Sequence, residues 1–68
     1  MNELKELKEL KEYIETLNKN LLKIVKLRNE KFKEHDKREV EYLEGQVKVY
    51  INVISDLNKI VFISEEVD

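Results

Sequence analysis

Two stripes of apolar residues with helical spacing, separated by a polar segment, constrain the fold of this 68-residue chain most strongly. Within each stripe the spacing alternates between three and four residues, as in a helix that packs against another helix. The first stripe consists of Leu7, Leu10, Ile14, Leu17, Leu21 and Ile24. The second consists of Val40, Leu43, Val47, Tyr50, Ile54, Leu57 and Val61. The pattern predicts two long amphipathic helices.

The segment between the stripes predicts a turn. Positions where one continuous stripe would need apolar residues are charged or polar: Arg28, Lys31, His35, Asp36 and Glu39. Asp36 is suited to cap a following helix, and Glu39, three residues later, completes the sequence pattern of a capping box. His35 and Val40 stand where a hydrophobic staple would join. We therefore expect the helix cap at Asp36 and Glu39.

The expected fold is all-α, an antiparallel hairpin of two helices over about residues 2–34 and 37–62. Residues 1–68 form a single helical domain, in which residues 63–68 are a frayed acidic tail. At a rise of 1.5 Å per residue, the first helix is about 50 Å long and the second about 39 Å. We therefore expect the N-terminal Glu/Lys/Leu repeat to project past the end of the second helix.

The second helix has more apolar surface than one partner helix covers, because Val49, Val53 and Ile60 widen its apolar arc to about 200°. Ordering so short a chain also costs on the order of 100 kcal/mol of conformational entropy. We therefore expect a homodimer that forms a four-helix bundle with coiled-coil packing and with Val49, Val53 and Ile60 at the subunit interface. Its predicted core contains Leu10, Ile14, Leu17, Leu21, Ile24, Val40, Leu43, Val47, Tyr50, Ile54 and Leu57.

Two other folds compete with this interpretation. In the first, a long helix runs to about residue 44 and is followed by a β-hairpin with strands at 47–54 and 59–64. The alternating apolar residues that favour this fold are Val47, Val49, Ile51 and Val53. In the second, the chain is one continuous helix in an elongated coiled coil, since the two stripes are nearly in phase on a single helical wheel.

Three residues depart from the apolar pattern. Arg28 lies within the first stripe, so we expect it to pair with Glu39 across the helix interface or to extend its stem to water. Gly45 lies inside the second helix, where it costs roughly 1 kcal/mol and suggests a close helix crossing. Asn58 lies within the second apolar arc and is suited to fix the register of the helices.

The residue inventory argues against enzymatic chemistry. The chain has no Cys and one His, and it contains no Gly-rich phosphate loop. A nucleophilic triad or a zinc site therefore lacks its parts within one chain. His35, Asp36 and Glu39 resemble a metal-ligand set only weakly, and capping explains them better. We expect no catalytic residues, cofactor or metal. Because the longest apolar run covers only Ile60 to Ile63, we expect a soluble protein without a membrane span. The absence of Cys favours a cytoplasmic location.

Charge is unevenly distributed along the chain. Residues 1–18 carry five acids and three bases (−2), residues 19–38 carry three acids and eight bases (+5), and residues 39–68 carry seven acids and two bases (−5). Pairing between a basic and an acidic helix explains this division. The alternative is a nucleic-acid or partner contact through a row of basic residues: Lys19, Lys23, Lys26, Lys33, Lys37 and Arg38.

The last four residues, Glu65 to Asp68, resemble the EEVD terminus with which cytosolic heat-shock chaperones engage tetratricopeptide-repeat clamps. The resemblance covers only these residues and implies a clamp protein as partner. From the whole chain we expect a non-enzymatic helical oligomerisation and protein-interaction module, such as a small regulator, inhibitor or adaptor. Its partners are a second copy of itself and a protein that the sequence does not identify. The alternative function is a small nucleic-acid-binding regulator.

Overall fold

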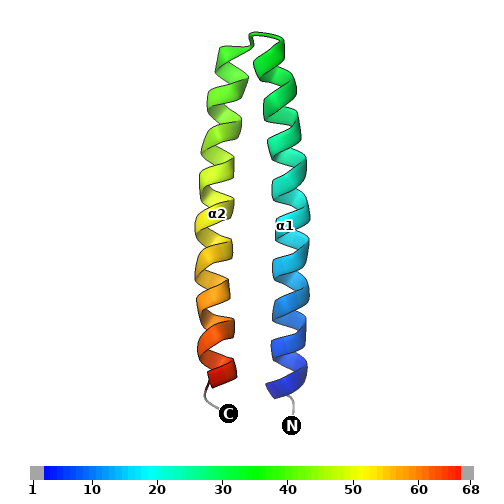
Figure 1. Ribbon diagram of the computed structural model, residues 1–68, viewed down its shortest axis with the longest axis vertical. Helices are drawn as coiled ribbons and strands as arrows, with labels where there is room; N and C mark the ends of the chain where they lie inside the picture. Colours follow the sequence, from blue (N-terminus) through cyan, green and yellow to red (C-terminus); the bar gives the residue numbers. More distant parts are fainter. Residues whose placement is uncertain (1–2, 67–68) are drawn as a thin grey trace.

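The computed structural model describes residues 3–66 as two antiparallel helices joined by a short turn (Figure 1). Helix α1 spans Glu3–Lys33, and helix α2 spans Lys37–Glu66. They pack side by side along their lengths, and the molecule measures 52 × 15 × 12 Å. The predicted all-α helical hairpin is therefore confirmed.

The β-hairpin alternative is wrong, because residues 47–54 and 59–64 both lie within α2, and the region 3–66 contains no strand. The helix places its apolar stripe against α1, whereas an isolated two-stranded hairpin would have had no sheet to stabilise it. The continuous-helix alternative is also wrong, because the chain reverses direction between Lys33 and Lys37 (Figure 1).

The turn ends α1 through a Schellman motif. His35 adopts a left-handed backbone conformation with φ of 61°. Its N–H donates to the Phe32 carbonyl at 3.1 Å, and the N–H of Asp36 donates to the Lys31 carbonyl at 3.0 Å. These two bonds satisfy carbonyls that the end of a helix would otherwise leave unpaired. His35, which is exposed, therefore ends α1 through its backbone conformation, while its contact with Val40 stays a prediction.

Asp36 also begins α2. Its Oδ1 accepts the N–H of Glu39 at 3.3 Å, and its backbone carbonyl accepts the N–H of Val40 at 3.0 Å. The predicted capping box also needed the Glu39 side chain to accept the N–H of Asp36. That N–H instead donates to Lys31, so only half of the box forms. One residue thus ends the first helix and starts the second.

Helix α2 continues to Glu66, four residues beyond its predicted end, so the two helices have nearly equal lengths of 31 and 30 residues. The predicted overhang of α1 is therefore wrong. At the open end of the hairpin, Val61 is buried, and Lys11 Nζ pairs with Glu65 Oε2 at 3.3 Å. Of the predicted tail, residues 63–66 are helical, and residues 67–68 lie outside the described part.

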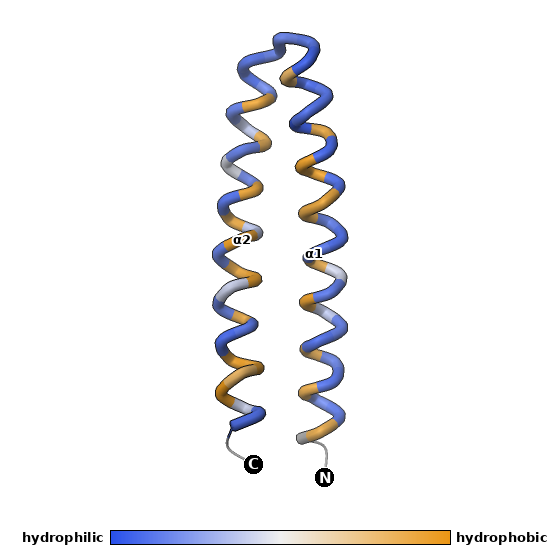
Figure 2. Tube along the Cα trace, viewed as in Figure 1, coloured by the Kyte–Doolittle hydropathy of each residue, from blue (hydrophilic) through white to orange (hydrophobic). Residues whose placement is uncertain are grey.

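The core is a single strip between the helices, which we call the seam. Figure 2 shows hydrophobic positions recurring along the facing sides of both helices. The buried apolar side chains are Ile14, Val40, Leu43, Ile54 and Val61. Half-buried residues pack against the part of this core formed by Ile14, Ile54 and Val61. They are Leu7, Leu10, Leu17, Leu21, Tyr50 and Leu57.

Replacing Asp36 with Ala removes the side-chain acceptor of the α2 cap and should lower the free energy of unfolding by about 1 kcal/mol. Asp36→Asn keeps an acceptor oxygen and should cost only a small part of that. Urea unfolding followed by circular dichroism measures both values. Equal stability of Asp36→Ala and the native chain would contradict the capping role.

Candidate interaction surface

Many large apolar side chains of the hairpin are exposed to solvent. In the described part, twelve large hydrophobic side chains are exposed and only five are buried. The chain exposes 5773 Å², about 1,200 Å² more than the roughly 4,500 Å² expected for a folded monomer of 8.2 kDa. A standard protein interface covers about 800 Å² on each partner. The excess is therefore large enough to supply one side of an interface.

Four of the exposed apolar residues form one row along α2, which we call the exposed apolar row. Tyr42, Val49, Val53 and Ile60 follow one another at spacings of seven, four and seven residues, which places them on one side of the helix. Their side chains are 61%, 61%, 41% and 50% exposed. The three residues predicted for the subunit interface thus lie in one solvent-exposed row, together with Tyr42.

Two exposed residues of α1 lie on the same side of the hairpin as this exposed apolar row. Tyr13 and Leu27 each come directly before a position of the α1 stripe, just as Val53 and Ile60 come directly before Ile54 and Val61 in α2. In an antiparallel pair, such preceding positions of both helices lie on the same face. We call this surface the apolar face, defined by Tyr13, Leu27, Tyr42, Val49, Val53 and Ile60.

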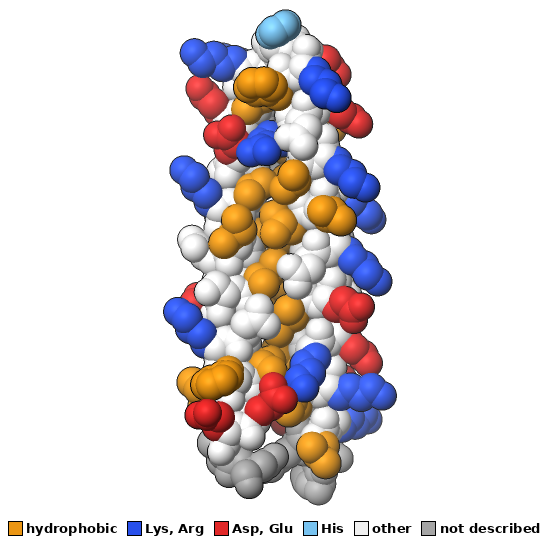
Figure 3. Space-filling model, viewed as in Figure 1, with side chains coloured by type: hydrophobic (Ala, Val, Ile, Leu, Met, Phe, Trp, Pro, Cys, Tyr) orange, Lys and Arg blue, Asp and Glu red, His pale blue; other side chains and the backbone are white. Residues whose placement is uncertain are grey.

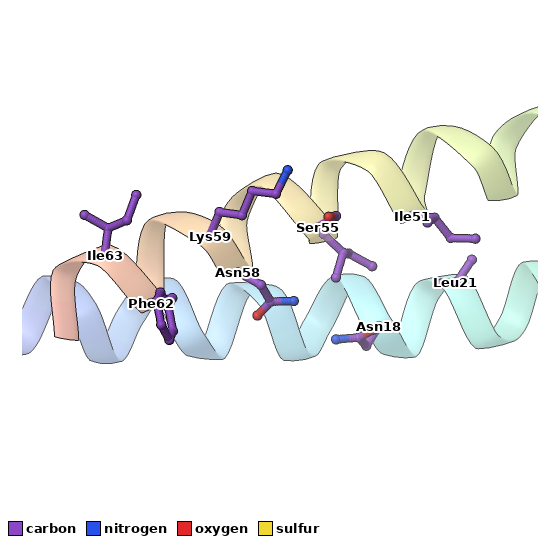
Figure 4. A pocket seen from close by; sticks show the side chains of 9 residues that line it. Asn18, Leu21, Ile51, Ser55, Asn58, Lys59, Phe62 and Ile63 are labelled. Carbon is purple, nitrogen blue, oxygen red and sulfur yellow. The ribbon is translucent and has the colours of Figure 1, made fainter. Parts of the chain in front are cut away.

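The opposite face carries both polar and apolar side chains. Residues that directly follow stripe positions lie there. One of them is Lys11, which forms with Glu65 the ion pair that bridges the helices. Asn18 and Asn58 also lie on this face, where they line a shallow open groove between α1 and α2 with Ser55 (Figure 4). Asn18 Nδ2 donates to the Ile14 carbonyl at 3.1 Å, and Asn58 is exposed.

Apolar side chains also enter this groove, from Leu21, Ile51 and Phe62. A view of one side of the molecule shows the apolar band that follows the seam, with charged side chains along both edges (Figure 3). We call this second surface the groove face. It combines hydrogen-bonding groups with apolar patches.

Gly45 does not mark a close crossing of α1 and α2. A Cβ atom added at Gly45 would meet no atom within 4 Å, so the close approach that we predicted there is wrong for the hairpin. Gly45 instead lies in a shallow hollow on α2, lined also by Tyr42, Gln46 and Val49. The hollow adjoins the apolar face and is open to any helix that packs there.

The structure places all predicted core residues along the seam, although to different depths. Four are buried: Ile14, Val40, Leu43 and Ile54. The others are half-buried: Leu10, Leu17, Leu21, Ile24, Val47, Tyr50 and Leu57. Our core set omitted Leu7 and Val61, which also belong to the seam. Both lie in the three-and-four stripes, so their spacing was the signal that identifies them.

Arg28 does not form the ion pair that we expected with Glu39. Its Nη2 donates to the Asn29 Oδ1 at 3.0 Å, and the side chain is half-buried. The ion pairs within residues 3–66 are Lys11 with Glu65 and Lys31 with Glu34. Arg28 therefore forms its side-chain hydrogen bond locally on α1.

The basic row lies on solvent-exposed surface. Lys19, Lys23, Lys26 and Lys33 are exposed on α1, and Lys37 and Arg38 are exposed in the first turn of α2. The ion pairs of the described helices involve none of these six residues. Their charges are therefore available to an anionic partner.

Comparison with known proteins assigns no family: no family model matches the chain, and no curated protein or solved structure is significantly similar to it. Neither α1 nor α2 has an apolar stretch of the length that a bilayer crossing requires. Over residues 3–66, His, Asp and Glu side chains do not gather into a group of three or more able to hold a metal ion.

Proposed function

We propose that this chain is a non-enzymatic helical module for oligomerisation and protein interaction, of the kind used by small regulators, inhibitors and adaptors. The apolar face is the observation that carries this proposal. It consists of large side chains that are between 41% and 61% exposed in the single hairpin. Contiguous exposed apolar surface of this kind marks protein interaction sites.

The composition of this surface also supports binding to protein. Tyr13 and Tyr42 add large amphipathic side chains, a residue type that is enriched in protein interfaces, and charged residues are depleted at interface centres. The chain offers little for catalysis, because it has one His and no Cys, and the two hollows described above are shallow and open. A binding role therefore fits the available chemistry better than a reaction does.

Replacing Val53 with Glu should dissociate the native oligomer, because association would then bury a charge at the centre of the apolar face. We expect sedimentation equilibrium to give a multiple of 8.2 kDa for the native chain. Val53→Glu should weaken the association constant by at least about tenfold, since each 1.4 kcal/mol corresponds to one such factor.

Ser55→Glu is the matched control, because it adds the same charge at an exposed position on the groove face of the same helix. It should leave the association unchanged. A native chain of 8.2 kDa at all concentrations would contradict self-association. A larger loss of association for Ser55→Glu than for Val53→Glu would show that the copies associate through the groove face and not through the apolar face.

A second candidate function is nucleic-acid binding through the basic row. The observation that favours it is that Lys19, Lys23, Lys26 and Lys33 are all exposed on one helix and have no ion-pair partner in the described part. Cations in such a row meet phosphates and release counterions, and this makes binding strongly dependent on salt.

Gel shifts on single- and double-stranded DNA and RNA test this candidate. If the row binds phosphates at four contacts, affinity should fall by roughly 100-fold between 50 and 200 mM salt on a duplex. Replacing Lys19, Lys23 and Lys26 with Gln should weaken binding on all sequences alike and flatten the salt dependence. Absence of any shift at low salt excludes this function.

A further inference from the structure

We propose that a second copy of this chain covers the apolar face, with the turns of the two hairpins at opposite ends of a four-helix bundle. This inference rests on the proposed function and specifies the partner and its orientation. Three observations carry it: the size of the uncovered surface, the symmetry of the exposed apolar row, and the separation of charge along the hairpin.

The surface area fits a second copy. The chain exposes about 1,200 Å² more than a folded monomer of its mass. A standard interface takes about 800 Å² from each partner, so a contact between two copies would absorb most of this excess. In a two-fold dimer both copies contribute the same patch, which requires that the patch be complementary to itself.

The exposed apolar row on α2 is symmetric about the middle of the helix, as such a patch requires. Tyr42 and Ile60 lie nine residues on either side of Ile51, and Val49 and Val53 lie two residues on either side of it. Ile51 is at the middle of α2, which spans Lys37–Glu66. When two α2 helices pack antiparallel about this midpoint, Tyr42 of one copy faces Ile60 of the other, and Val49 faces Val53. Every residue of the exposed apolar row then faces an apolar residue of the other copy.

The distribution of charge along the hairpin favours one relative orientation of the two copies. The half of the hairpin next to the turn, residues 19–50, carries nine basic and six acidic side chains, a net charge of +3. The open half of the described part, residues 3–18 and 51–66, carries four basic and eight acidic side chains, a net charge of −4. Each hairpin is therefore positive at its turn and negative at its open end.

Placing the turns of the two copies at opposite ends of the bundle brings unlike charges together. With both turns at one end, the +3 halves would lie beside each other and the −4 halves would do the same. With turns at opposite ends, each +3 half lies beside a −4 half. Packed helices are about 8–10 Å apart, close to the Debye length of roughly 8 Å at physiological salt, so this difference is only partly screened. Antiparallel α2 helices also oppose their dipoles favourably.

Spin labels can measure the orientation directly. The chain has no native Cys, so Lys33→Cys and Lys19→Cys each give one labelled site on an exposed position of α1. The two positions are fourteen residues apart on nearly the same side of the helix. Each variant loses one positive charge, so the pair is matched. Double electron–electron resonance on each homodimer, labelled with a methanethiosulfonate nitroxide, then gives a distance between copies.

With turns at opposite ends, the two Lys33→Cys labels should be separated by about 45 Å along the bundle, because residue 33 is fifteen residues from the middle of α1. The Lys19→Cys labels should be separated almost only by the width of the bundle. Similar distances for both variants would place the turns together and overturn this inference, while the proposed oligomerisation would stand. No distance between copies for either variant, with a mass of 8.2 kDa, would overturn both.

Discussion

Two helices packed side by side can bury only one strip of each, and the rest of this structure depends on that constraint. The seam between α1 and α2 buries five apolar side chains, while twelve others in the described part stay exposed. On α2 the apolar arc extends well beyond the strip that α1 covers. A hairpin of this composition therefore presents an uncovered apolar row as a direct consequence of its geometry, and association with another surface is the physical means of burying it.

Sequence periodicity predicted the two helices, the turn and most residues of the seam, because three-and-four spacing reports the face that packs. It did not predict the end of α2. Acidic residues after Ile63 signalled an end, but the buried Val61 and the ion pair between Lys11 and Glu65 stabilise the last turns. The ion pair joins residues 54 positions apart, and local sequence signals do not report contacts between such distant residues.

The turn shows a similar limit. Asp36 was recognisable as a cap, but its N–H completes the Schellman motif of the preceding helix and is not available for a capping box. Gly45 suggested a close crossing, and the hairpin leaves the space around it open. At the candidate site, the sequence singled out Val49, Val53 and Ile60. The contributions of Tyr13, Leu27 and Tyr42 needed the structure, since they depend on which sides of the two helices share a face.

The central claim is that association buries the apolar face and so stabilises the folded hairpin. Thermal unfolding of the native chain, followed by circular dichroism from about 1 μM to about 1 mM, tests it most directly, because a protein that dissociates on unfolding has a concentration-dependent midpoint. We expect a Tm that rises steadily with concentration. A Tm that is constant over this range, together with a mass of 8.2 kDa throughout, would contradict it.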